Sequence, residues 1–122
     1  MRTVLLADDD SELLEMYELW LADRDEWTTR TAADGDEALE KLDETVDVAV
    51  LDRRMPEVDG DEVARTVRST YPGCDVIVAS AFQPDDGIDD RHYDRYLTKP
   101  IQMETLVEAI STQLNGPVAT DS

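Results

Sequence analysis

The chain has 122 residues, enough for one compact domain with its own hydrophobic core and too few for two. Its net charge is −19, from 30 acidic and 11 basic residues, which argues against direct nucleic-acid binding because phosphate backbones need a basic face. The single cysteine, Cys74, cannot form an internal disulfide, and neither a secretory leader nor a membrane-length apolar run is present, so we expect a cytoplasmic protein.

The acidity has two interpretations. It could form an acidic docking surface, or it could solvate a protein that works at high salt, where screening confines charge repulsion to ~3 Å at 1 M. The acidic residues are spread over every segment, and only Lys41 and Lys99 are lysines against nine arginines. We favour the second interpretation and expect a salt-loving source.

The first predicted strand covers residues 3–7, and a helix with apolar residues at helical spacing follows over residues 11–22. The elements that follow are a polar edge strand at 27–32, a short helix at 36–42, a hydrophobic central strand at 46–51, a helix at 60–70, a strand at 75–80, a short strand at 95–97 and a helix at 103–114. Residues 1–115 should therefore form the domain, and residues 116–122 a flexible tail.

The segment between the last two strands departs from this alternation. Residues 84–90 have almost no apolar face, so a helix there should be short, distorted or mobile.

Strands that alternate with helices predict an open, doubly wound parallel sheet, in which functional groups collect at the carboxyl ends of the strands. Polar residues occur where most of the predicted strands end. Asp8 and Asp9 follow the first strand, Asp52 follows the third, Ser80 ends the fourth and Lys99 follows the fifth. These side chains should meet at one edge of the sheet.

Three carboxylates that converge are costly unless a cation neutralises them. Oxygen ligands without histidine or cysteine favour Mg²⁺, with Mn²⁺ possible. Asp52 could then attack phosphorus as a nucleophile, while Lys99 and Ser80 stabilise the phosphoryl oxygens. The alternative interpretation is that Asp8, Asp9 and Asp10 only stabilise the N-terminus of the following helix through its dipole.

Four segments together resemble the receiver domains of two-component response regulators, and the resemblance covers roughly residues 2–114. They are Leu-Leu-Ala-Asp-Asp-Asp at 5–10, Leu-Asp-Arg-Arg-Met-Pro-Glu-Val-Asp-Gly at 51–60, Val-Ala-Ser-Ala at 78–81 and Leu-Thr-Lys-Pro at 97–100. The Asp-Arg-Arg-Met-Pro string and the short segment after residue 80 are similar to haloarchaeal receivers. The resemblance implies a flavodoxin-like (βα)5 fold with a five-stranded sheet in the order 2-1-3-4-5.

The resemblance also implies the role of each site residue. Asp52 would accept a phosphoryl group from a sensor histidine kinase or a phosphotransfer protein, with Lys99 and Ser80 assisting. The metal ligands would be Asp8, Asp9, Asp52 and the backbone carbonyl of Arg54. The switch residues would be Ser80 and Tyr96, and Pro100 would follow a cis peptide bond.

Phosphorylation would switch the conformation of the domain in a phosphorelay, and a homodimer is possible. Beyond Mg²⁺-dependent self-phosphorylation we expect no enzymatic activity. Arg54 and Phe82 could shield the phosphoryl group, so autodephosphorylation should be slow. The alternatives are a pseudo-receiver that acts without phosphorylation and an aspartyl-dependent phosphohydrolase; the latter usually needs a second acid where this chain has Arg54.

Overall fold

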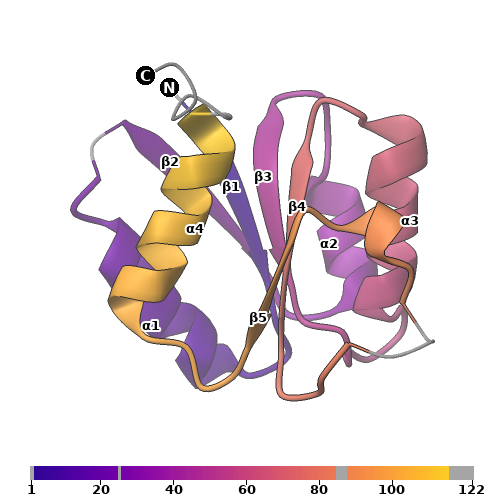
Figure 1. The fold of residues 1–122 in the computed structure, drawn as a ribbon, viewed down its shortest axis with the longest axis horizontal. Coiled ribbons are helices and arrows are strands. Elements are labelled where there is room, and N and C mark those ends of the chain that lie inside the picture. The colour runs from indigo at the N-terminus through magenta and orange to yellow at the C-terminus, as the bar shows by residue number, and fades with distance from the viewer. Residues whose placement is uncertain (1, 25, 85–87, 116–122) are drawn as a thin grey trace.

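The computed structural model of the chain describes residues 2–24, 26–84 and 88–115, and the predicted tail at 116–122 lies outside these residues. Strands and helices alternate along the chain (Figure 1). The elements are β1 (Arg2–Ala7), α1 (Ser11–Leu21), β2 (Trp27–Ala32), α2 (Gly35–Lys41), β3 (Val46–Leu51), α3 (Gly60–Thr70), β4 (Asp75–Ser80), a 3₁₀ turn (Asp90–His92), β5 (Arg95–Thr98) and α4 (Met103–Asn115).

The five strands form one parallel sheet in the order β2-β1-β3-β4-β5, which confirms the predicted strand order. As predicted, β2 is an edge strand and the hydrophobic β3 is central. Parallel pairing aligns the carboxyl ends: Ala7 of β1 lies beside both Ala32 of β2 and Leu51 of β3, and Ser80 of β4 lies beside Thr98 of β5. Residues that follow these ends therefore emerge at one edge of the sheet.

Helices cover both faces of the sheet, with α1 and α4 on one face and α2 and α3 on the other (Figure 1). Alternate residues of a strand point to opposite faces, so β1 contributes Val4 and Leu6 to the core under α1 and α4, and Leu5 and Ala7 to the core under α2 and α3. Because both faces are buried, the inner strands are almost continuously apolar.

Acidic side chains also cap two of the helices. The Asp10 carboxylate accepts hydrogen bonds from the backbone N–H groups of Glu12 and Leu13 and so caps α1. Asp34 caps α2 in the same way, through the backbone N–H of Glu37. Asp10 is therefore the residue that caps α1, whereas the Asp8 carboxylate accepts from the backbone N–H of Asp10.

The connection between β4 and β5 lacks an α-helix in the residues that the structure describes. It contains the 3₁₀ turn Asp90–His92, started by Asp89, whose side chain accepts from the backbone N–H of Arg91. Ile88 is the apolar residue that this connection buries in the core. Four α-helices of the (βα)5 pattern are thus present among the described residues. Of the segment 84–90, which was predicted to form at most a short or distorted helix, residues 85–87 lie outside the described residues.

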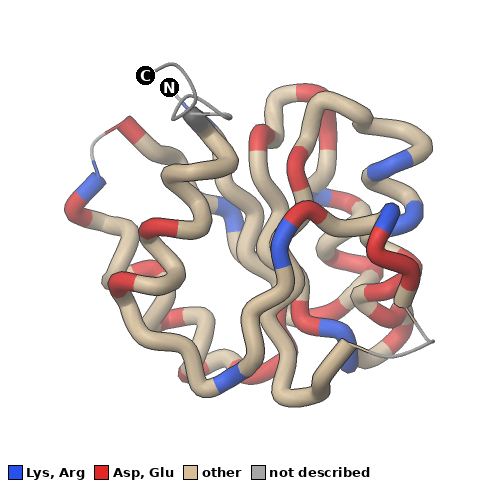
Figure 2. The backbone as a smooth tube through the Cα atoms, viewed as in Figure 1, with Lys and Arg blue, Asp and Glu red and all other residues tan. Residues whose placement is uncertain are grey.

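Acidic residues occur along the whole tube in Figure 2, on helices, strand ends and loops alike. Within the residues that the structure describes, no helix is both long enough and apolar enough to cross a membrane.

Candidate functional site

Three carboxylates converge at the carboxyl edge of the sheet. Asp8 and Asp9 follow β1, Asp52 follows β3, and one oxygen from each lies within 4.8 Å of the other two. The parallel ladder continues past the strand ends, because the backbone N–H of Asp8 donates to Ala32 and that of Asp52 donates to Ala7. This pairing fixes Asp8 and Asp52 next to each other, both buried, while Asp9 is exposed.

Lys99 brings a positive charge to this cluster from the end of β5. Its Nζ atom lies 2.6 Å from Asp8 Oδ2 and 3.6 Å from Asp52 Oδ2. The peptide bond between Lys99 and Pro100 is cis, and the backbone N–H of Lys99 donates to the Ser80 carbonyl. The lysine thus reaches two aspartates that lie more than forty residues away in sequence.

The Asp52 carboxyl is poorly solvated. Burial and the neighbouring negative charge of Asp8 raise its pKa to about 6, against the opposing effects of Lys99 and of a hydrogen bond from the Arg54 backbone. The charged form of this carboxyl is therefore disfavoured unless a further cation lies nearby. Asp8, Asp9 and Asp52 are oxygen donors with charges to neutralise, so this set fits a hard divalent ion such as Mg²⁺.

Ser80 and Tyr96 flank the loop that follows β4. Ser80 is fully buried, and its hydroxyl oxygen accepts a hydrogen bond from the Phe82 backbone N–H at 3.1 Å. The half-buried Tyr96 donates its hydroxyl to the Phe82 carbonyl and packs edge-on against Tyr93, with ring centroids 5.4 Å apart. Both predicted switch residues therefore contact the same residue of the loop.

Arg53 and Arg54 have opposite environments. The Arg54 guanidinium is exposed and lies 5.0 Å from the centre of the Phe82 ring, so the two residues expected to shield Asp52 contact each other. Arg53 is buried and paired with Asp61 in the first turn of α3. No role was predicted for Arg53, and the sequence signal for this pair is the acidic residue Asp61 near the start of the next predicted helix.

No role was predicted for Tyr17 of α1 either. It is buried, and its hydroxyl has no hydrogen-bond partner among the described residues. Burial and the charges of Asp8 and Asp52 raise its pKa. The hydroxyl is therefore a neutral dipole near the carboxylates.

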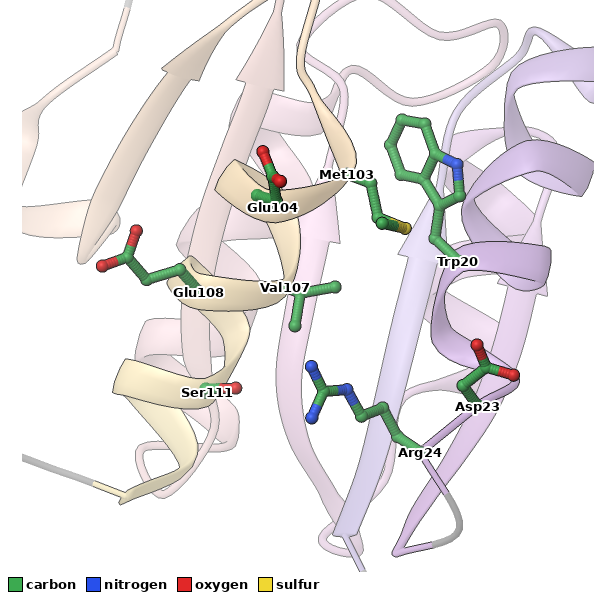
Figure 3. Close-up of a pocket in the computed structure, with 8 residues that line it drawn as sticks. All are labelled: Trp20, Asp23, Arg24, Met103, Glu104, Val107, Glu108 and Ser111. Atoms are coloured by element: carbon green, nitrogen blue, oxygen red, sulfur yellow. The ribbon is translucent and has the colours of Figure 1, made fainter.

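A separate groove of about 520 Å³ lies between α1 and α4 (Figure 3). Trp20 of α1 faces Met103 and Val107 of α4 across it, and Asp23 and Glu108 are among the acidic residues at its sides. It shares no residue with the carboxylate cluster, so we place the chemistry at the edge of the sheet.

An open parallel sheet with carboxylates and a lysine at its carboxyl edge is the class of architecture that binds ligands beside the strand ends. The chain belongs to the response regulator receiver domain family, whose model matches residues 4–111, and receiver domains serve two-component signalling. This membership confirms the family predicted from the four sequence segments.

Known relatives agree with this assignment. A Haloferax volcanii protein described as a transcriptional regulator is 40% identical over 113 residues, which make up 93% of this chain and 19% of that protein. The Mycobacterium tuberculosis transcriptional regulatory protein TrcR is 38% identical over 112 residues, 85% of this chain and 42% of that protein. The chain thus spans from a fifth to about half of the length of the curated relatives it matches.

Solved structures show the same fold. A receiver domain protein from Methanospirillum hungatei superposes with a TM-score of 0.85 at 23% identity, covering 94% of each chain. The response regulator TrrA from Thermotoga maritima, solved in complex with Mg²⁺ and beryllofluoride, superposes with a TM-score of 0.80 at 26% identity, covering 93% of this chain and 99% of that one. The haloarchaeal relative also confirms the predicted similarity to haloarchaeal receivers.

Proposed function

We propose that this chain accepts a phosphoryl group on Asp52 from a histidine kinase or a phosphotransfer protein, and that the modified domain changes conformation to pass on the signal. The observation that carries the proposal is the convergence of the Asp8, Asp9 and Asp52 carboxylates with the Lys99 ammonium at the carboxyl edge of the sheet. Family membership supplies the phosphorelay context.

In the proposed reaction, an Asp52 carboxylate oxygen attacks the phosphorus of a phosphohistidine. The new O–P bond forms as the P–N bond breaks, and the imidazole nitrogen leaves with the electron pair. Lys99 and the Ser80 hydroxyl stabilise the charge on the phosphoryl oxygens. Such a transfer depends mostly on positioning and on charge neutralisation, both of which this site offers.

Asp8, Asp9 and Asp52 would hold Mg²⁺, and the sequence-based expectation adds the Arg54 backbone carbonyl. The ion would neutralise the carboxylates and bind phosphoryl oxygens. Mn²⁺ has similar ligand preferences and could replace it.

The switch is proposed to start at Ser80. A phosphoryl group adds a charge of about −2 beside the buried hydroxyl, which can donate its proton to a phosphoryl oxygen while its own oxygen still accepts from Phe82. Since Tyr96 is bonded to the carbonyl of the same Phe82, the position of its ring is coupled to that of Ser80. Phosphorylation then biases two conformations of the surface around β5 and α4.

The phosphoryl donor needs a docking surface close to Lys99. An open, mainly apolar groove of about 350 Å³ begins there, lined by Leu13, Met16, Tyr17, Ala81, Lys99, Pro100 and Ile101. Met16 is 39% exposed. We propose that the kinase or phosphotransfer protein binds in this groove. We also propose that the domain works in the cytoplasm and that it can form a homodimer.

Intact-mass spectrometry after incubation with Mg²⁺ and acetyl phosphate tests the proposal. We expect one phosphoryl adduct on the wild-type protein and none on Asp52→Asn or in the presence of EDTA. If the folded protein gains no adduct at low or high salt, an interaction module that works without phosphorylation becomes the better description.

A further inference from the structure

The side chain of Arg53, next to the proposed phosphoryl acceptor, is buried and held on both sides. It is 3% exposed, and its Nε and Nη2 atoms each lie 2.9 Å from a different carboxylate oxygen of Asp61. Its backbone is also fixed, because the N–H of Gly60 donates to the Arg53 carbonyl at 2.9 Å. The ion pair with Asp61 and the backbone hydrogen bond from Gly60 therefore fix the orientation of the guanidinium relative to the start of α3.

The other end of the guanidinium reaches the loop after β4. Its Nη1 atom lies 3.4 Å from the Gln83 carbonyl oxygen and 3.4 Å from the Tyr96 hydroxyl oxygen. The Tyr96 hydroxyl donates to the Phe82 carbonyl, and the Phe82 backbone N–H donates to the Ser80 hydroxyl oxygen. These contacts connect Arg53 to Ser80 through Tyr96 and the loop.

This arrangement determines how the Ser80 hydroxyl is used. The oxygen already accepts from Phe82, so the hydroxyl proton remains to be donated elsewhere. An incoming phosphoryl oxygen at Asp52 is the acceptor that the proposed reaction provides. A loop held in place before the ligand arrives needs less ordering when the ligand binds.

We propose that Arg53 is a positioning residue for phosphoryl binding: anchored by Asp61, it holds residues 81–83 and Tyr96 so that Ser80 is ready to donate. The inference rests on the proposed function. It gives Arg53 no role as a ligand of Mg²⁺, which Asp8, Asp9, Asp52 and the Arg54 carbonyl would hold, so it concerns recognition of the phosphoryl group.

This separation supplies the test. The dissociation constants for Mg²⁺ alone, and for beryllofluoride at saturating Mg²⁺, are measured by titration calorimetry on the wild type, Arg53→Lys, Arg53→Met and Tyr96→Phe. Arg53→Lys keeps a positive charge for Asp61 but lacks the second guanidinium nitrogen that contacts the Gln83 carbonyl and the Tyr96 hydroxyl. We expect each variant to bind beryllofluoride about two- to tenfold more weakly, which is the range for one lost hydrogen bond, with unchanged Mg²⁺ affinity.

Combining Arg53→Lys with Tyr96→Phe tests whether the two residues act as one unit. We expect the double variant to bind no more weakly than the weaker single variant. The matched control is Arg68→Met, which removes the Arg68–Asp94 ion pair at the other end of α3 and should leave both dissociation constants unchanged.

Three results would overturn the inference: unchanged beryllofluoride affinity in Arg53→Lys, a parallel loss of Mg²⁺ affinity, or fully multiplicative losses in the double variant. Thermal melting of each variant confirms that it is folded. If Arg53→Met does not fold, the test is made with Arg53→Lys. A wild-type protein that binds Mg²⁺ but no beryllofluoride would instead overturn the proposed function itself, and this inference with it.

Discussion

Asp52 has to serve as a charged nucleophile in a place that disfavours charge. Burial and the Asp8 carboxylate both oppose its ionisation, and one lysine at 3.6 Å offsets them only in part. In the metal-free protein the unfolded state therefore releases the Asp52 proton more readily than the folded state does. Ionisation of Asp52 lowers the free energy of unfolding, and a bound divalent ion would restore it.

We predict that Asp52→Asn stabilises the metal-free protein at neutral pH. The folded pKa of about 6 lies above the ordinary value of 3.8, so stability falls as pH rises from about 4 to about 6 and stays low above that window. Removing the charge should raise the free energy of unfolding by up to about 3 kcal/mol at about pH 8, and by less at about pH 5.

Urea denaturation in EDTA at both pH values measures this effect. Asp23→Asn, an exposed acid outside the cluster, is the control and should change little. Equal gains for Asp52→Asn at the two pH values would show that ionisation of Asp52 is not the cause.

Arg54 and Phe82 form the second residue-scale prediction. Their contact beside the acceptor should limit the access of water to the phosphoryl group, so we predict that Arg54→Ala hydrolyses its aspartyl phosphate faster than the wild type, by about two- to tenfold. Loss of the adduct is followed by intact mass after acetyl phosphate is removed. Arg24→Ala disrupts a similar stack on Trp27, away from the site, and should not change the rate. A slower or unchanged rate in Arg54→Ala would contradict the shielding role.

At the scale of elements, the site depends on how closely α3 approaches the end of β3. A Cβ atom on Gly60 would lie 1.9 Å from the Asp52 carbonyl oxygen and 3.0 Å from the Arg53 Cα atom. Any side chain at this position must push the first turn of α3 away from the acceptor. The glycine thus allows the helix to begin against the backbone of Asp52, the proposed acceptor, and of Arg53 beside it.

We predict that Gly60→Ala lowers the free energy of unfolding by about 1–3 kcal/mol, as overpacking in a core does, and also reduces phosphorylation by acetyl phosphate. Gly73→Ala is the control, because a Cβ atom there has no neighbour within 4 Å, and it should change stability by about 0.5 kcal/mol or less. Equal effects of the two substitutions would point to backbone entropy rather than to close packing.

The elements show what sequence alone could reveal. The apolar runs of β3 and β4 and the helical spacing of α1 predicted these elements to within one residue, because both patterns arise from burial. The carboxyl-edge rule then grouped Asp8, Asp52 and Lys99 correctly. Arg53 was missed because a charged residue normally indicates exposure, and its burial depends on Asp61 and on Tyr96, which lies 43 residues away.

At the scale of the whole molecule, the charge of −19 comes from acidic residues that are spread along the chain (Figure 2). Ion pairs such as Arg30–Asp43 and Arg68–Asp94 neutralise only part of it, since acidic residues outnumber basic ones by nearly three to one. The remaining like charges repel one another at long range in dilute buffer. Their repulsion opposes the compact state and is screened by salt.

We therefore predict that the free energy of unfolding rises by about 1 kcal/mol or more as KCl increases from about 0.1 M to about 2 M, where the screening length is a few ångströms. Replacing the exposed acids Glu15, Glu18 and Glu108 by glutamine should raise stability at low salt and make it less dependent on salt. Urea denaturation at each KCl concentration measures both effects. If the triple variant gains as much from salt as the wild type, then preferential exclusion of the salt, and not screening of surface charge, stabilises the folded domain.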